Sequence, residues 1–343
     1  MINNKKISSL QDGCVYYFLM DEPTSVIKKH PIYKIMSVDF LLINELTNIK
    51  KLQNIKKYKI YYYVYEPSSK LKINGLNEGL KNSTSLFKYE NRELIYLKHY
   101  LKTLSSSTKY VFTIIDFYKR LLKSIDLLIS QNIYHNHINF DTIVVDKHIP
   151  LLSNFSFSLD TSRKNINTHI EPFFMVYDLS YLERPLELHI LSYLITNNLT
   201  GPQNSLSSYN IENIICDVVE NNNILKTFSD TIVSSYKQEA LEYFKKYINK
   251  PYDYILSDIL QYSNTWDNYA LSILFLRILI GLHRSIEKQN KFIIMFMKLL
   301  VCNIHLNPFK RLSINTTTNK FDAILNGLEI EDYKEILDNL VFA

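Results

Sequence analysis

Residues 133–156 contain the polar side chains whose types and spacing are best suited to chemistry. His135 and His137 stand two residues apart, and Asn139 and Thr142 follow in the same short loop. A histidine with a pKa near neutrality can accept a proton from a hydroxyl, so His137 is a candidate general base. Mg²⁺ prefers carboxylate oxygens, and neither an amide nor a hydroxyl supplies one. The loop therefore offers a proton acceptor and weak metal ligands.

A helix and two strands are predicted to position this loop. Apolar residues recur at three- and four-residue spacing over residues 110–131, which predicts an amphipathic helix that ends at the loop. The apolar pairs at 143–144 and 151–152 predict two strands joined by a turn. The tripeptide Asn154-Phe155-Ser156 follows the second strand. The predicted order is helix, loop and hairpin.

This order resembles the catalytic core of the protein kinase superfamily. There a helix leads into His-Arg-Asp-x-x-x-x-Asn, and a hairpin leads into Asp-Phe-Gly. On that pattern the catalytic aspartate falls on His137 and the following lysine on Asn139, while the two metal-binding positions fall on Thr142 and Asn154. Asp146 and Asp160 are the nearby carboxylates that a shifted register would recruit. The resemblance implies a kinase scaffold that lacks the catalytic side chains.

The glycines exclude the two common glycine-rich phosphate loops. The chain has six glycines, at positions 13, 75, 79, 201, 281 and 327. They cannot form Gly-x-Gly-x-x-Gly, and no Gly-Lys-Ser/Thr occurs. Such loops need glycine because their backbone amides must approach the phosphates without an intervening Cβ. Where the family has its nucleotide-covering loop, the chain has Asp21-Glu22-Pro23, whose acidic side chains repel phosphate.

The N-terminal part resembles the small lobe of the family. Five strands are predicted, at residues 14–20, 24–29, 32–36, 59–66 and 93–100. An amphipathic helix is predicted over residues 38–55, and Glu45 within it falls on the family's ion-pairing glutamate. Its implied partner is Lys34, with Lys28 as the alternative, and this pair is the candidate nucleotide-binding site. Both lysines are equally consistent with exposed strand positions in a lysine-rich chain.

Further blocks of the resemblance follow in the family's order. After a polar loop at 157–171, Pro185 and Glu187 resemble the Ala-Pro-Glu block. Asp267 begins a helix that resembles the family's central buried helix, and Arg311 falls in a block that resembles Asp-Pro-x-x-Arg-x-Thr. The resemblance implies that Arg311 is the buried partner of Glu187.

Three positions are predicted to hold the two lobes together. His135, Phe155 and Ile49 fall where the family stacks side chains between its lobes, and Asp267 falls where a carboxylate anchors the catalytic loop. Such a buried carboxylate must be fully hydrogen-bonded, because an unsatisfied charge costs several kcal/mol.

The expected fold is therefore α+β with two lobes. The small lobe, residues 1–104, is rich in β-strands and has one regulatory helix. The large lobe, residues 105–343, is mostly helical, and a Ser-rich hinge is expected over 101–108. We interpret residues 196–257 as a helical insertion with a solvated surface. The kinase-like domain covers about residues 12–326.

Composition limits the class of protein and of partner. Of 343 residues, 46% are hydrophobic and 21% charged, which is typical of a globular chain. The net charge of +5 is too small and too dispersed to indicate a nucleic-acid partner. Cys14, Cys216 and Cys302 show neither disulfide nor zinc spacing. The apolar run 270–282 is too short to span a bilayer, and no signal peptide or myristoylation signal is evident. A cytoplasmic protein is expected, in the host cytoplasm if the AT-rich, virus-like composition indicates a large DNA virus.

The sequence predicts a pseudokinase that acts by binding another protein. The partner would be an active kinase or a host signalling protein, bound through residues 38–55 and 157–181, and no cofactor is expected. The first alternative is an unconventional Ser/Thr kinase that uses ATP and Mg²⁺, with Lys34 and Glu45 at the phosphates and His137 as base. The second is a structural protein that inherited the fold. The spacing His135-Asn-His137 also occurs in metal nucleases, but the strand at 143–145 replaces the helix that a nuclease needs.

Overall fold

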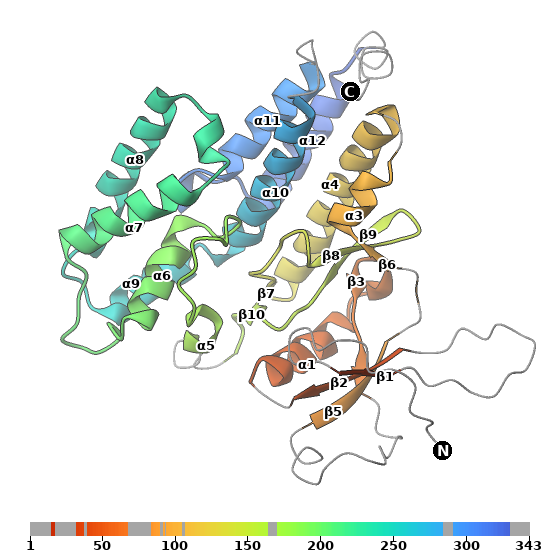
Figure 1. Ribbon diagram of the computed structural model, residues 1–343, viewed down its shortest axis with the longest axis horizontal. Helices are drawn as coiled ribbons and strands as arrows, with labels where there is room; N and C mark the ends of the chain where they lie inside the picture. Colours follow the sequence, from red (N-terminus) through yellow and green to blue (C-terminus); the bar gives the residue numbers. More distant parts are fainter. Residues whose placement is uncertain are drawn as a thin grey trace, which may run out of the picture.

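The chain has an α+β fold in which strands and helices occupy different ends. The computed structural model describes residues 15–17, 32–37, 40–67, 84–89, 92, 94–104, 107–163, 170–283 and 291–329. Strands β1, β2 and β5 lie beside helix α1 at one end, and the helices that follow α4 gather at the other (Figure 1). The hairpin of β8 and β9 lies between these two parts (Figure 1). This arrangement confirms the predicted α+β class.

The N-terminal sheet is small and antiparallel. Its order is β1-β2-β5-β4. The strands are β1 (Val15–Tyr17), β2 (Ile32–Ser37), β5 (Thr84–Tyr89) and β4 (Glu66–Pro67). Helix α1 (Phe40–Leu52) follows β2 and matches the predicted amphipathic helix. The strand predicted at 24–29, which includes Lys28, lies outside the described residues.

A second sheet contains the predicted hairpin. Its order is β3-β9-β8-β6. The strands are β3 (Tyr62–Tyr63), β9 (Ile149–Ser153), β8 (Ile143–Asp146) and β6 (Leu94–Tyr96). The two strands are present as predicted, and the structure adds their register, in which Ile143 pairs with Leu152 and Val144 with Leu151. The short strands β7 (Ile133–Tyr134) and β10 (Leu159–Asp160) pair beside the loop.

Most of the remaining chain is helical. The α-helices are α3 (Leu97–Lys102), α4 (Ser107–Ser130), α5 (Glu171–Phe174), α6 (Leu186–Thr196), α7 (Ser208–Asn221), α8 (Asp230–Phe244), α9 (Tyr252–Leu260), α10 (Trp266–His283), α11 (Lys291–Asn303) and α12 (Ile314–Asn326). Short 3₁₀ helices are η1 (Tyr58–Ile60), η3 (Leu225–Thr227), η4 (Lys245–Tyr247), η5 (Ser263–Thr265) and η6 (Pro308–Lys310). No helix in the described ranges is long and apolar enough to cross a membrane.

Two predicted strands and the hinge are shorter or different in the structure. The segment predicted as a strand over 59–66 begins in η1 and is extended only in β3 and at its end. The segment at 93–100 forms β6 and then turns into α3. Helix α3 also takes up the start of the predicted hinge. This segment is helical because its buried apolar residues Leu97, Tyr100 and Leu101 recur at helical spacing.

The segment 196–257 is helical and has many exposed residues, but it also contributes a buried apolar face. Its buried residues form one of the two large cores together with α6 and Trp266. The apolar side chains it contributes include Leu206, Ile211, Ile214, Ile215, Val219, Phe244, Tyr247, Tyr252 and Ile255. The other large core joins α4, β8, β9 and α10 to α12. The many polar residues on the other faces of α7 and α8 made this apolar face difficult to recognise in the sequence.

Asparagine takes left-handed backbone positions in this glycine-poor chain. Five of the eight described non-glycine residues with positive φ are asparagines. Asn198, which follows α6, has φ 55° and an exposed side chain. Asparagine tolerates this conformation better than other residues that have a Cβ.

Replacing Asn198 by alanine is therefore expected to destabilise the protein by about 1 kcal/mol, because alanine is strained at positive φ. Urea unfolding measures the change in unfolding free energy. Asn198→Gly is the rescue variant and should restore most of the loss. Asn197→Ala, at φ −92° in the same turn, is the control. Equal losses for Asn198→Ala and Asn198→Gly would contradict the prediction.

Candidate functional site

Asp267 anchors the start of the candidate catalytic loop. Its Oδ2 accepts the backbone N–H of His135 at 2.6 Å, and its Oδ1 accepts that of Asn136 at 2.8 Å. The residue is 1% exposed, and burial raises the pKa of its carboxyl to about 6 against the opposing effect of these two hydrogen bonds. The first turn of the buried helix α10 thus holds the loop by its backbone, as the resemblance implied.

Asp267→Asn is expected to lower the unfolding free energy by about 2–3 kcal/mol at pH 7.5. The amide keeps one acceptor but turns an NH₂ toward a buried backbone N–H, which loses its partner. Urea unfolding measures the loss. Asp116→Asn, at a half-exposed residue paired with Arg120, is the matched control and should cost less than about 0.5 kcal/mol. Similar losses in the two variants would show that Asp267 is not an anchor.

A stack of rings connects the loop to the strands. His135 and Phe155 lie with ring centroids 4.9 Å apart, and Tyr62 contacts Phe155 at 5.7 Å. His135 Nε2 donates to the carbonyl of Ser153 at 3.0 Å, and burial lowers the pKa of His135 to about 3. The imidazole is therefore neutral at pH 7. Sequence reasoning identified His135 and Phe155 but missed Tyr62, which an aromatic run at 61–63 obscured.

Ile49, the third residue expected in this stack, belongs to a neighbouring cluster. It is 2% exposed and groups with Leu42 and Tyr65 between α1 and the strands. Ile49 is thus buried between the same elements, but its cluster is separate from the one that contains Phe155.

Glu45 connects helix α1 to the residue that follows the hairpin. Its Oε1 accepts the backbone N–H of Phe155 at 3.0 Å, and its Oε2 accepts the hydroxyl of Tyr65 at 2.7 Å. The backbone of Lys34 lies in β2, where it pairs with Phe87. The Lys34 side chain and all of Lys28 lie outside the described part of the chain. The Lys34–Glu45 ion pair therefore stays a prediction.

Thr142 and Asn139 close the loop upon itself. The Thr142 hydroxyl donates to the carbonyl of His137 at 2.9 Å and accepts the backbone N–H of Asn139 at 3.0 Å. Asn139 Oδ1 accepts the backbone N–H of Asp141 and of Thr142, at 2.8 and 3.1 Å. Thr142 is only 2% exposed. Both side chains are thus occupied by contacts within the loop.

His137 lies against two aromatic rings. Its ring centroid is 5.1 Å from that of Phe157 and 5.6 Å from that of Tyr181. Asn139 Nδ2 lies 3.4 Å from His137 Nε2. Burial, with the nearby positive charge of Arg184, lowers the pKa of His137 to about 4. The imidazole is neutral at pH 7, but such a weakly basic nitrogen is a poor acceptor for a hydroxyl proton.

The alternative oxygen ligands are engaged elsewhere. Asn154 adopts φ 61°, is exposed, and its Oδ1 accepts the hydroxyl of Ser156 at 2.6 Å. Asp146 pairs with Arg92 at 3.2 Å, and Asp160 pairs with Lys51 at 2.6 Å. Within the described ranges, no group of three or more His, Cys, Asp and Glu residues could hold a metal ion.

Glu187 and Arg311 form a buried bidentate ion pair. The two guanidinium nitrogens lie 2.5 and 2.8 Å from the carboxylate oxygens, and both side chains are 1% exposed. Arg311 also donates to the carbonyl of His305 and to the hydroxyl of Thr265. Pro185 precedes α6 and begins the helix that holds Glu187. The predicted pairing of Glu187 with Arg311 is present.

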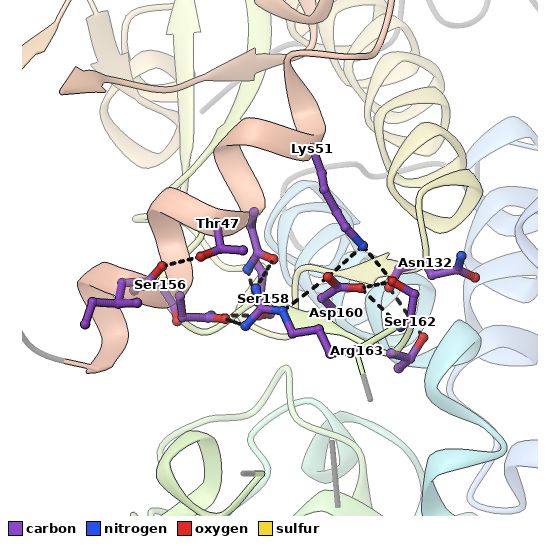
Figure 2. Close-up of polar contacts among 12 residues, drawn as sticks. Thr47, Lys51, Asn132, Ser156, Ser158, Asp160, Ser162 and Arg163 are labelled. Atoms are coloured by element: carbon purple, nitrogen blue, oxygen red, sulfur yellow. Dashed lines mark hydrogen bonds and ion pairs between the residues drawn. The ribbon is translucent and has the colours of Figure 1, made fainter. Parts of the chain in front are cut away.

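Two asparagines of α1 hold the segment that follows Phe155. Asn44 Nδ2 donates to the carbonyls of Ser156 and Ser158, both at 2.8 Å, and Asn48 Nδ2 donates to that of Ser158 at 2.9 Å. Arg163 donates to Oδ1 of Asn44 and of Asn48, at 2.9 and 3.1 Å. Figure 2 shows the helix lying along this segment.

Asp160 completes this contact from the other side. Its carboxylate pairs with Lys51 of α1 at 2.6 Å and with Arg163 at 3.2 Å, and it accepts the hydroxyl of Ser162 at 2.7 Å (Figure 2). The hydrogen bonds to Lys51 and Ser162 lower the pKa of Asp160 against the effect of burial. Sequence reasoning missed this network. The sequence feature that indicated this network is the pair Asn44 and Asn48, which lie one helical turn apart on a face of α1 that is buried in the structure.

The geometry thus shows a loop anchored by a buried carboxylate, a ring stack and a helix held against the following segment. A scan of the chain against protein-family models and a search of curated protein sequences both return no match.

Proposed function

We propose that this protein is a pseudokinase: a kinase-like fold that carries out little or no phosphotransfer and acts by binding another protein. The observation that carries the proposal is that the Thr142 hydroxyl makes hydrogen bonds within its own loop, the loop that Asp267 anchors. The loop is held firmly by its backbone, yet the threonine hydroxyl at the metal-binding position is used to close the loop. In this view the chain has retained the scaffold and replaced its chemistry.

The contacts around the loop support the kinase-like part of the proposal. The resemblance required a backbone anchor at Asp267, a ring contact between His135 and Phe155, and an ion pair between Glu187 and Arg311. All three contacts exist, and each joins residues more than 15 positions apart in the sequence. This combination of long-range contacts is what the resemblance implies, and it supports a kinase-like arrangement of the loop.

The side chains at the reactive positions support the loss of catalysis. Phosphoryl transfer depends on positioning and on neutralising charge at the transferred phosphate, chiefly by Mg²⁺. Thr142 and Asn154 are neutral and hydrogen-bonded locally, and His137 is packed between rings. General-base catalysis contributes about 10²–10⁴-fold, which does not compensate for weak metal binding.

A titration with ATP tests the proposal directly. We expect ATP to give no stabilisation that depends on Mg²⁺ or Mn²⁺, because a ligand raises the melting temperature only if it binds the folded state. The measurement is the melting temperature of the full chain with ATP, with and without metal. An assay for transfer of labelled phosphate to protein runs beside it. Metal-dependent stabilisation together with transfer that Lys34→Ala abolishes would refute the pseudokinase proposal.

The position of Glu45 favours one competing function, nucleotide binding with residual kinase activity. Its carboxylate is buried beside the backbone of Phe155, where the family places its ion-pairing glutamate. Under this alternative, Lys34 joins Glu45 at the phosphates, and ATP with Mg²⁺ is the cofactor. The same titration separates the two functions, since only the alternative requires metal-dependent stabilisation.

The exposed apolar side chains favour a protein partner. Phe40 and Ile43 on α1 are 40% and 54% exposed, and Met175 and Val176 after α5 are 62% and 59% exposed. Phe40 contacts Phe173 of α5 with ring centroids 5.2 Å apart, which joins the two groups. This surface combines parts of the predicted partner-binding segments 38–55 and 157–181. A cytoplasmic partner, such as an active kinase or host signalling protein, fits the proposal.

A further inference from the structure

Two stretches of the chain carry lysines without any acidic residue. Residues 46–65 contain five lysines, residues 94–115 contain three, and neither stretch contains aspartate or glutamate. The whole chain has 39 lysines and arginines against 34 aspartates and glutamates, so its charges are nearly balanced elsewhere. The small net charge of +5 therefore conceals a local excess of positive charge. The two stretches form one strongly basic surface only if the fold brings them together.

The β8–β9 hairpin brings the two stretches together. Each contributes an edge strand to the sheet of this hairpin, β3 at one edge and β6 at the other. Because β3 runs parallel to β9, the helix η1 before β3 lies beside the beginning of β9 and close to the turn at Lys147. On the other side Leu94 pairs with Asp146, and the hydroxyl of Tyr100 is hydrogen-bonded to Nδ1 of His148. The hairpin thus lies between α3 and β3 (Figure 1).

Arg92 holds this arrangement and neutralises the acidic side chain beside the turn. Its Nη1 donates to the carbonyl of Lys59 at 3.3 Å and to Oδ2 of Asp146 at 3.2 Å. The guanidinium therefore joins η1 to the hairpin. Because the carboxylate of Asp146 is paired with Arg92, it does not neutralise the lysines around the turn.

Five exposed lysines surround the turn without a carboxylate partner. None of them forms an ion pair in the described part of the chain: Lys56, Lys57, Lys98, Lys102 and Lys147. We call these five residues the basic surface. Like charges on one surface repel one another over the Debye length, which is about 8 Å at physiological ionic strength. An anionic group that contacts several of these lysines relieves this repulsion.

The side-chain types of the basic surface favour carboxylates over phosphates as its ligands. Arginine is the preferred side chain for phosphates and nucleic acids, because its planar fork matches a phosphate in bidentate geometry. The basic surface contains only lysines, and the neighbouring Arg92 is already bound to Lys59 and Asp146. Lysine is a compact charge on a flexible stem, so several lysines can pair with carboxylates at variable spacing.

We propose that the basic surface binds an acidic segment of the partner protein, whose aspartate and glutamate carboxylates face the five lysines. The proposal rests on the proposed function, since it names the chemistry of the protein that the pseudokinase binds. The basic surface is separate from the exposed apolar residues Phe40 and Ile43. These two lie at the start of α1, whereas Lys56 and Lys57 follow its end. The acidic segment thus makes a second contact beside the apolar one.

A labelled acidic peptide tests the charge requirement. The probe is (Glu-Gly)₄-amide with tetramethylrhodamine at its N-terminus, and the control peptide has Gln in place of each Glu. Fluorescence anisotropy with the full chain at about 50 mM NaCl should show binding of the Glu peptide. The Gln peptide should bind at least tenfold more weakly, because it carries no charge. Raising NaCl to about 200 mM should weaken the Glu peptide about fivefold, because salt screens exposed charges.

Charge variants locate the binding. Lys57→Gln combined with Lys147→Gln should weaken the Glu peptide at least fivefold, whereas the same positions changed to arginine should retain most of the affinity. The matched control combines Lys226→Gln with Lys310→Gln, which removes the same charge from exposed residues of η3 and η6. It should leave the affinity within about twofold, since charges beyond a Debye length are screened. Circular dichroism verifies that each variant is folded.

Phosphate probes separate an acidic segment from a nucleic acid or a membrane. Five thymidines linked by four phosphates carry the same number of charges as the Glu peptide, and vesicles of phosphatidylserine and phosphatidylcholine provide an anionic lipid surface. We expect both to bind more weakly than the Glu peptide. Tighter binding of either probe, abolished by the variant Lys57→Gln/Lys147→Gln, would reassign the basic surface to phosphates and overturn the proposal.

Two further outcomes would overturn the acidic-segment site: equal affinities for the Glu and Gln peptides, or equal losses in the surface variant and the control variant. None of these outcomes depends on ATP. Failure of the pseudokinase proposal appears instead as metal-dependent stabilisation and phosphotransfer, so the two failures are distinguishable.

Discussion

Acidification from pH 6.5 to pH 4 is expected to unfold this protein cooperatively. His135 and His189 are buried and His137 is partly buried, and desolvation lowers their pKa values to about 3, 3 and 4, so all three are uncharged at pH 7. In the unfolded chain a histidine titrates near pH 6.5. The unfolded state therefore takes up protons first. The stabilisation from the neutral histidines is complete above pH 6.5 and is lost as the pH falls through the folded pKa values.

Neighbouring charges set the size of this effect. Arg184 lowers the pKa of both His137 and His189, while Asp141 and Asp178 oppose it. Asp267 acts in the other direction, because its pKa is raised to about 6. Its contribution is present at low pH and is lost as the pH rises through 6. For these four groups together, the three histidines outweigh Asp267, and the unfolding free energy falls by about 3 kcal/mol per pH unit between pH 6 and 4.

Urea unfolding at a series of pH values measures this dependence. A typical domain is stable by about 5–15 kcal/mol, so most of its stability disappears within this range. His189→Gln should reduce the number of protons taken up on unfolding by about one, whatever it does to overall stability. His99→Gln changes an exposed residue of α3 and is the control. An unfolding free energy that stays constant from pH 6.5 to 5 would show that these histidines are not buried in neutral form.

Breaking the Glu187–Arg311 pair is the second change with a large expected effect. Glu187→Leu should lower the unfolding free energy by about 3–5 kcal/mol, because it leaves a buried guanidinium without its carboxylate. Arg311→Met should cost at least as much, since it also removes donors to His305 and Thr265. The pair joins α6 to the segment before α12.

A double-mutant cycle separates the pair from its surroundings. Glu187→Leu combined with Arg311→Met should cost clearly less than the sum of the single variants, because no buried charge remains unpaired. Lys119 and Asp322 form an exposed pair, so Asp322→Ala is the matched control and should cost less than about 1 kcal/mol. Additive losses in the cycle would contradict direct coupling between Glu187 and Arg311.

The sequence was most informative where local pattern and motif order decide the structure. Helical spacing predicted α1 and α4, and the two apolar pairs predicted the strands β8 and β9 joined by a turn. Such periodicity depends only on residues that are close in the sequence, so it can be recognised without knowledge of the fold. The order of blocks in the resemblance also predicted the contacts of Asp267, Phe155 and Arg311.

Local pattern failed where burial depends on distant segments. The polar residues of 196–257 concealed the apolar faces that pack against α6, because a helix face is buried only if another element covers it. The strands predicted at 59–66 and 93–100 are interrupted by η1 and α3, where tertiary packing outweighs β propensity.

The sequence by itself predicted, through the resemblance, which chemistry is missing at 133–156: His137, Thr142 and Asn154 stand where that resemblance implies two aspartates and an asparagine. Only the tertiary structure decided what these side chains do instead. Thr142 closes its own loop and His137 packs between two rings. The structure also brought Lys57, Lys98 and Lys147 to one surface around the β8–β9 turn. Residues so far apart in the chain meet only when packing brings their elements together, so no spacing in the sequence encodes their proximity.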